Sequence, residues 1–92
     1  MYIILVYDIV LDETGPAVLR KVFKECKKYL VHIQNSVFEG ELTEAQLFKL
    51  EMTLKKLLRK DKDSLIVFKT RNEKWLDKEF WGKKDNATSN FI

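Results

Sequence analysis

The chain has 92 residues, of which 46% are hydrophobic, 34% charged and 12% aromatic, and its formal net charge is +3. These values are typical of one globular domain and exclude a disordered chain, and no apolar run reaches the roughly 20 residues that a membrane span needs. Because the single cysteine, Cys26, cannot form an internal disulfide and no Cys/His group has zinc-site spacing, we expect the reducing cytoplasm.

The first predicted element is a strand over residues 2–9. This segment is a continuous run of β-branched and aromatic residues, which is typical of a central strand buried on both faces. It has neither a basic leader nor a cleavage site, so we do not expect a signal peptide. The run ends in an acidic loop that begins at Asp8 and continues through Asp12 and Glu13.

A helix is predicted next, starting at Gly15 and Pro16, because proline is favoured in the first turn. Apolar residues then recur at helical spacing, and bases occupy the opposite side. The apolar stripe consists of Leu19, Val22, Phe23, Cys26 and Leu30, and the basic side of Arg20, Lys21, Lys24, Lys27 and Lys28.

Residues 32–42 are predicted to be extended, as a short hairpin turning at Asn35 and Ser36 or as one bent strand. Thr43 and Gln46 form a capping-box pattern that begins a second helix, whose apolar stripe is made of leucines. A second short buried strand is predicted over residues 65–68. The order predicts an α+β, ferredoxin-like βαββαβ sandwich with two helices on one face of an antiparallel sheet.

The second face of this sheet has no helix to cover it, so we expect a homodimer whose sheets pack across a two-fold axis. A chain this short buries only about 60 to 70% of its unfolded surface, which also favours association. The tail from Lys74 contains Trp75, Phe80 and Trp81, and we expect it to be a strand or arm that docks on the partner. The chain is thus predicted to be one domain over residues 1–92, with a core over 1–70 and an arm over 71–92.

Positive charge is concentrated in two segments. Residues 18–32 hold five bases and one acid, and residues 49–62 hold six bases and two acids. Such clusters fit a polyanion such as nucleic acid. The alternative is that they are the solvated faces of two amphipathic helices.

Asp8 is the candidate catalytic and metal-binding residue, because functional side chains collect where strands of a sheet end. If a two-fold axis brought two copies of Asp8 together, the pair could share a divalent metal such as magnesium, which prefers oxygen ligands and could activate a water on a phosphodiester. Alternatively, Asp8 only ends the strand. Asp12 and Glu13 are either outer metal partners or partners of the helix dipole, and the lone His32 is expected to be structural rather than a general base.

Three blocks of the sequence together carry a family resemblance. They are Met1 to Ile9 (MYIILVYDI), Ile33 to Leu42 (IQNSVFEGEL) and Asp63 to Phe68 (DSLIVF). In this order and at these separations they resemble the signature blocks of the family of CRISPR-associated protein two. The tail from Trp75, with Gly82 and the final Asn90, Phe91 and Ile92, is also similar to the ends of some members.

The resemblance implies a ferredoxin-like homodimer of the CRISPR adaptation module. Members bridge dimers of CRISPR-associated protein one, the integrase, and help hold double-stranded spacer DNA. Many are metal-dependent endonucleases on single-stranded RNA or double-stranded DNA, and their metal-binding aspartate corresponds to Asp8. The family's Ser-Val-Phe corresponds to Ser36, Val37 and Phe38, so Ser36, Phe38 and Tyr7 are predicted to support the site.

One position departs from the family pattern. Many relatives carry an arginine where this chain has His32, and a histidine there would be a weaker, pH-dependent phosphate ligand. The alternative function is a stand-alone, toxin-type ribonuclease of the same fold, acting on RNA without an integrase. Tyr7, Phe38 and Phe68 could in principle stack on bases, although their apolar neighbours favour a place in the core or an interface.

Overall fold

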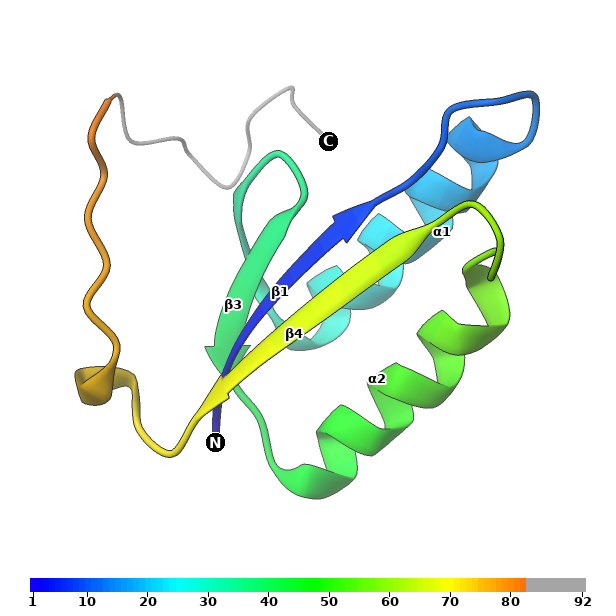
Figure 1. Ribbon diagram of the computed structural model, residues 1–92. Helices are drawn as coiled ribbons and strands as arrows, with labels where there is room; N and C mark the ends of the chain where they lie inside the picture. Colours follow the sequence, from blue (N-terminus) through cyan, green and yellow to red (C-terminus); the bar gives the residue numbers. More distant parts are fainter. Residues whose placement is uncertain (83–92) are drawn as a thin grey trace.

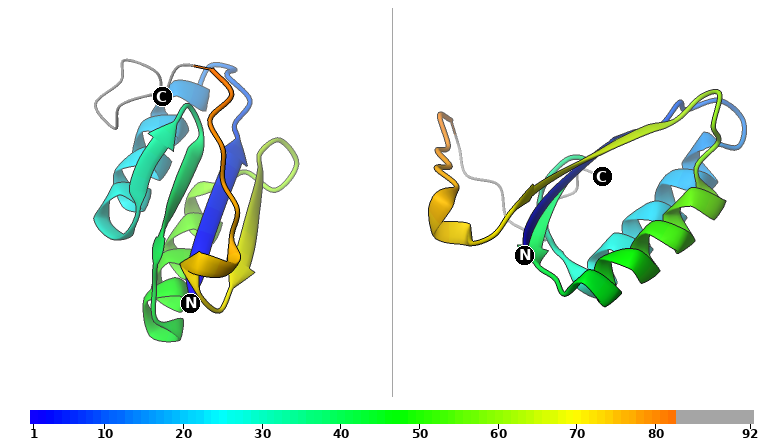
Figure 2. Two further views of the ribbon diagram at one scale, coloured as in Figure 1. Left: turned by 90° about the vertical axis from the view of Figure 1, so that its left-hand side faces the viewer. Right: turned by 60° about the horizontal axis from the view of Figure 1, so that its bottom comes forward.

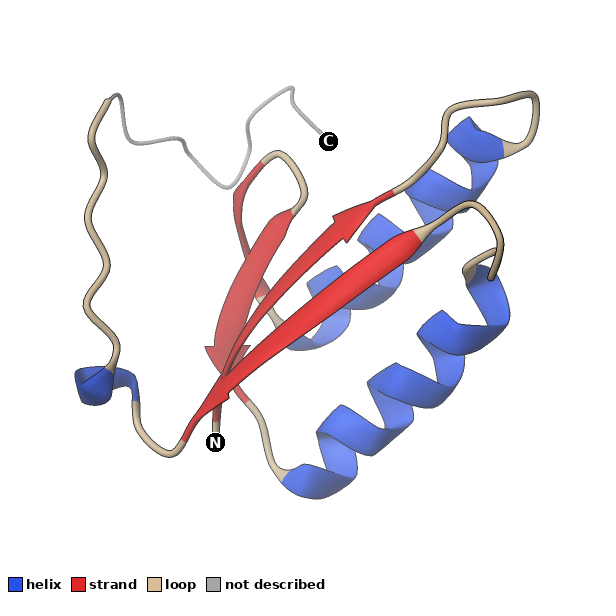
Figure 3. Ribbon diagram, in the orientation of Figure 1, coloured by secondary structure: helices blue, strands red, loops and turns tan. Residues whose placement is uncertain are grey.

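The computed structural model describes residues 1–82. Its four strands form one antiparallel sheet in the order β2-β3-β1-β4, and its two helices lie side by side on one face of that sheet (Figures 1 and 3). This confirms the predicted α+β sandwich. The elements are β1 (Tyr2–Asp8), α1 (Gly15–Tyr29), β2 (Val31–Gln34), β3 (Val37–Glu41), α2 (Glu44–Leu57), β4 (Ser64–Thr70) and a short 3-10 helix, η1 (Glu73–Trp75).

Strand β1 lies in the middle of the sheet, as predicted, but its two faces differ. Ile3, Leu5 and Tyr7 point toward the helices and are buried in the core. Ile4 and Val6, on the opposite face, are only half-buried. The expectation of burial on both faces is therefore wrong for the second face, which no helix covers (Figure 2).

Strand β4 is an edge strand and not the short buried strand that was predicted. It pairs with β1 along its whole length, and its residues alternate between the two faces of the sheet. Leu65 and Val67 pack against the core, whereas Ile66 and Phe68 are 55% and 57% exposed on the face without helices. A short apolar run has the same sequence pattern whether the strand is buried on both of its faces or on only one.

Helix α1 begins where it was predicted. The Gly15 amide donates to the Asp12 carboxylate at 3.0 Å, and Pro16 follows in the first turn. Glycine is required at position 15, because a Cβ there would lie 2.2 Å from the backbone oxygen of Val10. The loop between β1 and α1 is therefore packed tightly against the helix start.

Of the two alternatives for residues 32–42, the structure has the hairpin. Strands β2 and β3 pair antiparallel, and the turn between them places Asn35 at φ 43°, a left-handed conformation that asparagine tolerates. His32 is buried, and its ring contacts those of Phe23 and Phe38 at centroid distances of 4.9 and 5.0 Å. The predicted structural role of His32 fits this position, which does not offer a side chain to phosphate.

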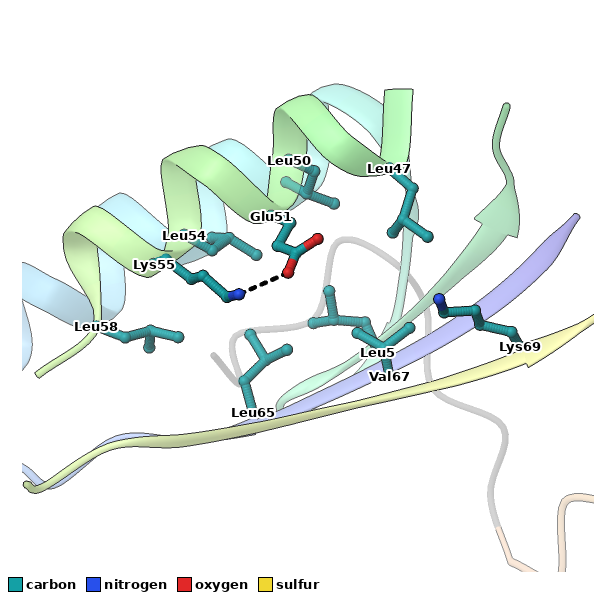
Figure 4. A pocket seen from close by; sticks show the side chains of 10 residues that line it. All are labelled: Leu5, Leu47, Leu50, Glu51, Leu54, Lys55, Leu58, Leu65, Val67 and Lys69. Carbon is teal, nitrogen blue, oxygen red and sulfur yellow. Dashed lines mark ion pairs between the residues drawn. The ribbon is translucent and has the colours of Figure 1, made fainter. Parts of the chain in front are cut away.

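Helix α2 starts with the predicted capping box. The Gln46 amide donates to Thr43 Oγ1 at 3.1 Å, and the Thr43 amide donates to Gln46 Oε1 at 3.0 Å. On its sheet side, α2 packs leucines over β1 and β4. They leave an apolar groove of about 320 Å³ beside β4, with the Glu51–Lys55 ion pair at its edge (Figure 4).

After β4, the chain turns through η1 and passes over the face that the helices leave open (Figure 2). Lys78 forms an ion pair with Glu39 of β3, and residues 78–82 line a hollow of about 420 Å³ together with Ile4, Ile33 and Val37. The predicted arm thus starts on its own subunit, and its final residues, including Phe91 and Ile92, lie outside the described residues. Within residues 1–82, no helix is both long enough and apolar enough to cross a membrane.

Candidate functional site

Asp8 is the last residue of β1, and its side chain is exposed. Because side chains alternate along a strand, Asp8 shares the open face of the sheet with Ile4 and Val6. Its partner across the ladder is Ser64, the first residue of β4. The carboxylate therefore stands at the end of an apolar surface, opposite the face that the helices cover.

The backbone around Asp8 is held from both sides. The Tyr7 amide donates to the backbone oxygen of Ser36 at 3.2 Å, which ties β1 to the hairpin turn. On the other side, the Val10 amide donates to the Asp63 carboxylate at 3.0 Å. Asp8 thus lies between two anchored positions, which sets where the backbone places its carboxylate.

A polar network fixes the loop that follows Asp8. Arg59, just beyond α2, donates to Asp63, to Asp12 and to the backbone oxygen of Val10. Hydrogen bonds from Arg59 hold the pKa of Asp63 at about 2, and those from Lys62 and Arg59 hold the pKa of Asp12 well below its usual range. Both carboxylates are therefore ionised at neutral pH.

The network decides between the two predicted roles of Asp12. Its oxygens accept from Arg59, Lys62 and the Gly15 amide, which makes it a partner of the helix start rather than a group turned toward a metal. Sequence reasoning missed Arg59 and Asp63. The available signal was their i, i+4 spacing directly before the strand that pairs with β1.

The three predicted supporting residues contribute in different ways. Tyr7 and Phe38 are buried in the core, with ring centroids 6.1 Å apart, so neither ring is available to stack on a base. Burial raises the pKa of Tyr7, and within residues 1–82 no group hydrogen-bonds its hydroxyl. Ser36 is half-buried and acts through the backbone oxygen that accepts from Tyr7.

A single subunit does not form a metal centre within residues 1–82, because they contain no group of three or more His, Cys, Asp or Glu side chains placed to hold an ion. Asp8 contributes one carboxylate. Magnesium binds through one or two carboxylates and keeps several of its waters, so a second copy of Asp8 would complete a donor set of the right chemistry.

The predicted basic face lies on the exposed side of α1. Its residues fall within an arc of about 120° of the helix surface, since successive residues are about 100° apart. Two of the bases have neighbours within the subunit: Lys28 pairs with Glu25 at 2.8 Å, and Lys27 lies 6.0 Å from the centroid of the Phe23 ring. The exposed bases are Arg20, Lys21, Lys24, Lys27 and Lys28.

The groove beside α2 is a poor candidate for a phosphodiester site. Leucines and a valine line most of it, and it opens on the helix side of the sheet, away from the face that carries Asp8 (Figure 4). Its ion pair, Glu51 with Lys55 at 2.7 Å, is internally neutral. Asp8, by contrast, offers an exposed carboxylate at the end of an anchored strand, on the face without helices.

Comparison with known proteins gives consistent results. The family described as "CRISPR associated protein Cas2" matches residues 1–78. A protein of Fusobacterium nucleatum named "CRISPR-associated endoribonuclease Cas2" is 52% identical over all of this chain and 87% of its own length. A protein of Methanosarcina acetivorans with the same name is 38% identical over the whole of both chains.

Solved structures show the same arrangement. The crystal structure of Streptococcus pyogenes Cas2 at pH 6.5 superposes with a TM-score of 0.75 and 27% identity, over 87% of this chain and 99% of that one. A second structure, described as a crystal structure of Cas2, superposes with a TM-score of 0.76 and 37% identity, over 100% of this chain and 98% of that one.

Proposed function

The chain belongs to the Cas2 family of CRISPR-associated proteins, and from this premise we propose that it is an endoribonuclease that works as a homodimer and hydrolyses phosphodiester bonds at its paired Asp8 residues. The names of the two relatives support the activity. The resemblance in the three sequence blocks supports the choice of Asp8.

One observation carries the assignment: Asp8 lies on the same face of the sheet as the uncovered apolar residues. Ile66 and Phe68 of β4 expose more than half of their surface there. Half-buried Val6 of β1 lies beside Ile66 as its ladder partner. Burial of this face against a second copy is the favourable step. Asp8 continues the same row of side chains, so a two-fold axis that passes near this end of β1 would cover the apolar face and also bring the two carboxylates toward each other.

The chemistry divides between the bound ion and the chain. A divalent cation such as magnesium, held by the two Asp8 carboxylates, would polarise the phosphodiester and lower the pKa of a water. The chain orients the two carboxylates, because β1 is anchored on both sides of Asp8. Each Asp8 would then act as an oxygen ligand whose position is set by the anchored end of β1.

The experiment compares Asp8→Asn with Asp61→Asn, a matched change of an exposed aspartate in the turn before β4. We expect magnesium-dependent cleavage of a single-stranded RNA oligonucleotide to be lost in Asp8→Asn and kept in Asp61→Asn. Asn has nearly the same shape as Asp but no charge, so the loss would be due to the missing ligand. Cleavage by purified Asp8→Asn at the wild-type rate would refute the assignment.

We further propose that the dimer serves as an adaptor in CRISPR spacer acquisition, bridging two dimers of the integrase, CRISPR-associated protein one, and binding double-stranded spacer DNA through the basic face of α1. The five exposed bases on one arc of this helix support it. Tyr7 and Phe38, which are buried, would serve this function only by packing.

The DNA surface is tested by changing Arg20, Lys24 and Lys28 together to Glu. We expect affinity for a duplex to fall and the salt dependence of binding to become shallower, because fewer phosphates would be neutralised. The control changes Lys49, Lys56 and Lys60 of the second basic segment to Glu, which alters net charge equally. Equal losses in the two triple variants would show that overall charge, and not the α1 face, determines binding.

The arm over residues 71–92 is proposed to meet the partner or the integrase. In support, Trp75 and Trp81 are 67% and 93% exposed in the single subunit. The cytoplasm remains the proposed location, in keeping with Cys26, a free thiol buried in the core.

A further inference from the structure

We propose that Arg59 and Asp63, which together we call the loop clamp, are positioning residues that set the direction of the Asp8 carboxylate. The proposal rests on the proposed function of Asp8 as the metal-binding residue. It assigns a role in the reaction to two residues to which the family resemblance gave none, although Asp63 begins its third sequence block, and it follows from contacts within one subunit.

The Asp63 side chain is fully buried, and both of its oxygens are used. Oδ1 accepts from the Val10 amide at 3.0 Å and from Arg59 Nη2 at 2.9 Å. Oδ2 accepts from the Arg59 amide and from Arg59 Nε, each at 2.9 Å. The two-pronged pairing of guanidinium and carboxylate fixes the orientation of both groups.

The remaining donors of Arg59 reach the loop after Asp8. Nη2 donates to the backbone oxygen of Val10 at 2.6 Å, and Nη1 donates to Asp12 Oδ1 at 2.5 Å and to Thr14 Oγ1 at 2.8 Å. Both backbone groups of Val10 are therefore held by the loop clamp. An ion pair that only stabilised the turn before β4 would not need these two contacts with the Val10 backbone.

The held position is two residues from Asp8, and the residue after Asp63 is the ladder partner of Asp8. One side of the strand end is thus fixed by the loop clamp, while Ser36 fixes the other. Two carboxylates that must converge on one ion across a two-fold axis tolerate little misalignment, since a displacement of about 1 Å can cost about 100-fold in rate.

The test measures kcat and KM for magnesium-dependent cleavage of a single-stranded RNA oligonucleotide, at a temperature where circular dichroism shows each variant folded. Asp63→Asn keeps the shape of the side chain but loses its charge and one acceptor. Arg59→Lys keeps the charge but not the fork. The control is Glu51→Gln, which breaks an exposed ion pair on α2.

We expect Asp63→Asn to lower kcat about 10- to 100-fold, as partners of metal ligands typically do, while KM stays within about threefold. Arg59→Lys should fall between this variant and the wild type, and Glu51→Gln should match the wild type. A merely structural role would instead change the fraction of folded protein, leaving kcat per folded molecule unchanged. A wild-type kcat in folded Asp63→Asn would overturn the proposal.

Hydrogen exchange of the Val10 amide gives a second, activity-independent measurement. We expect this amide to exchange faster in Asp63→Asn and Arg59→Lys than in the wild type, because its acceptor is weakened or released. Unchanged exchange in both variants would overturn the loop clamp even if activity fell. If the wild-type protein did not cleave RNA, the proposed function would fail, whereas the exchange rates would still decide whether the clamp fixes the end of β1.

Discussion

Truncation of one aromatic side chain on the open face should separate the two subunits. Phe68 is 57% exposed in the single subunit. Since a phenylalanine exposes about 200 Å² when fully accessible, its uncovered part is about 115 Å², and burying this at about 25 cal/mol per Å² contributes about 3 kcal/mol. In a two-fold interface each change counts twice, so about 6 kcal/mol is the upper limit for the two copies.

Alanine keeps part of the contact, so we expect Phe68→Ala to weaken dimerisation by about 2 to 4 kcal/mol, or about 30- to 700-fold in Kd. Sedimentation equilibrium over a range of concentrations measures this. The matched control is Phe48→Ala, because Phe48 is 61% exposed but belongs to α2, on the other side of the sheet. We expect this variant to dimerise as the wild type does.

Two outcomes would contradict this prediction. If Phe68→Ala associated as tightly as the wild type, the open face could not be the dimer surface. If Phe48→Ala weakened association as much, exposed apolar area in general would be responsible. The subunit fold itself should be little changed in either variant, since both side chains are more than half exposed before association.

Three further predictions concern the subunit. Tyr7→Phe should raise the free energy of unfolding by about 1 to 3 kcal/mol, because it removes a buried hydroxyl without a partner in residues 1–82. A clear loss of stability in urea unfolding would contradict this. Gly15→Ala should lower it by about 1 to 3 kcal/mol, because the new Cβ would lie 2.2 Å from the backbone oxygen of Val10; an unchanged melting temperature would count against the packing described. Arg59 lowers the pKa of Asp63 from 3.8 to about 2, so the stabilisation by this carboxylate is fully present above pH 4 and is lost as pH falls through about 2. In acid unfolding, Asp63→Asn should therefore lose less stability than the wild type between pH 4 and 2. Parallel curves for the two proteins would exclude this carboxylate as a source of the loss.

Local patterns in the sequence were sufficient to predict most of the fold. The Gly15–Pro16 helix start, the capping box of Thr43 and Gln46, and the Asn35 turn all rest on interactions within a few residues, and the structure has each of them. Such interactions can be read from the sequence because the partners are close in the chain.

What was missed depends on contacts between distant segments. The position of β4 at the sheet edge follows from the pairing order of the strands, which the apolar run Leu65 to Phe68 does not encode. Arg59 reaches Asp12 across a separation of 47 residues, so its part in holding the loop after Asp8 had no local signal beyond the nearby Asp63. Asp8 was predicted from a local feature, its place at the end of a strand, and its role stays a prediction.

The short connection from Arg59 to Ser64 helps to set which side of the sheet each β4 side chain faces. Because neighbouring residues of a strand point to opposite sides, inserting one residue there would shift β4 by one place against β1 and exchange its two sets of side chains. Ile66 and Phe68 would then turn inward beneath α2, and Leu65 and Val67 would turn outward. The length of this connection therefore determines which hydrophobic residues lie on the open face, and a one-residue insertion should yield a protein that still forms strands but does not form the proposed homodimer.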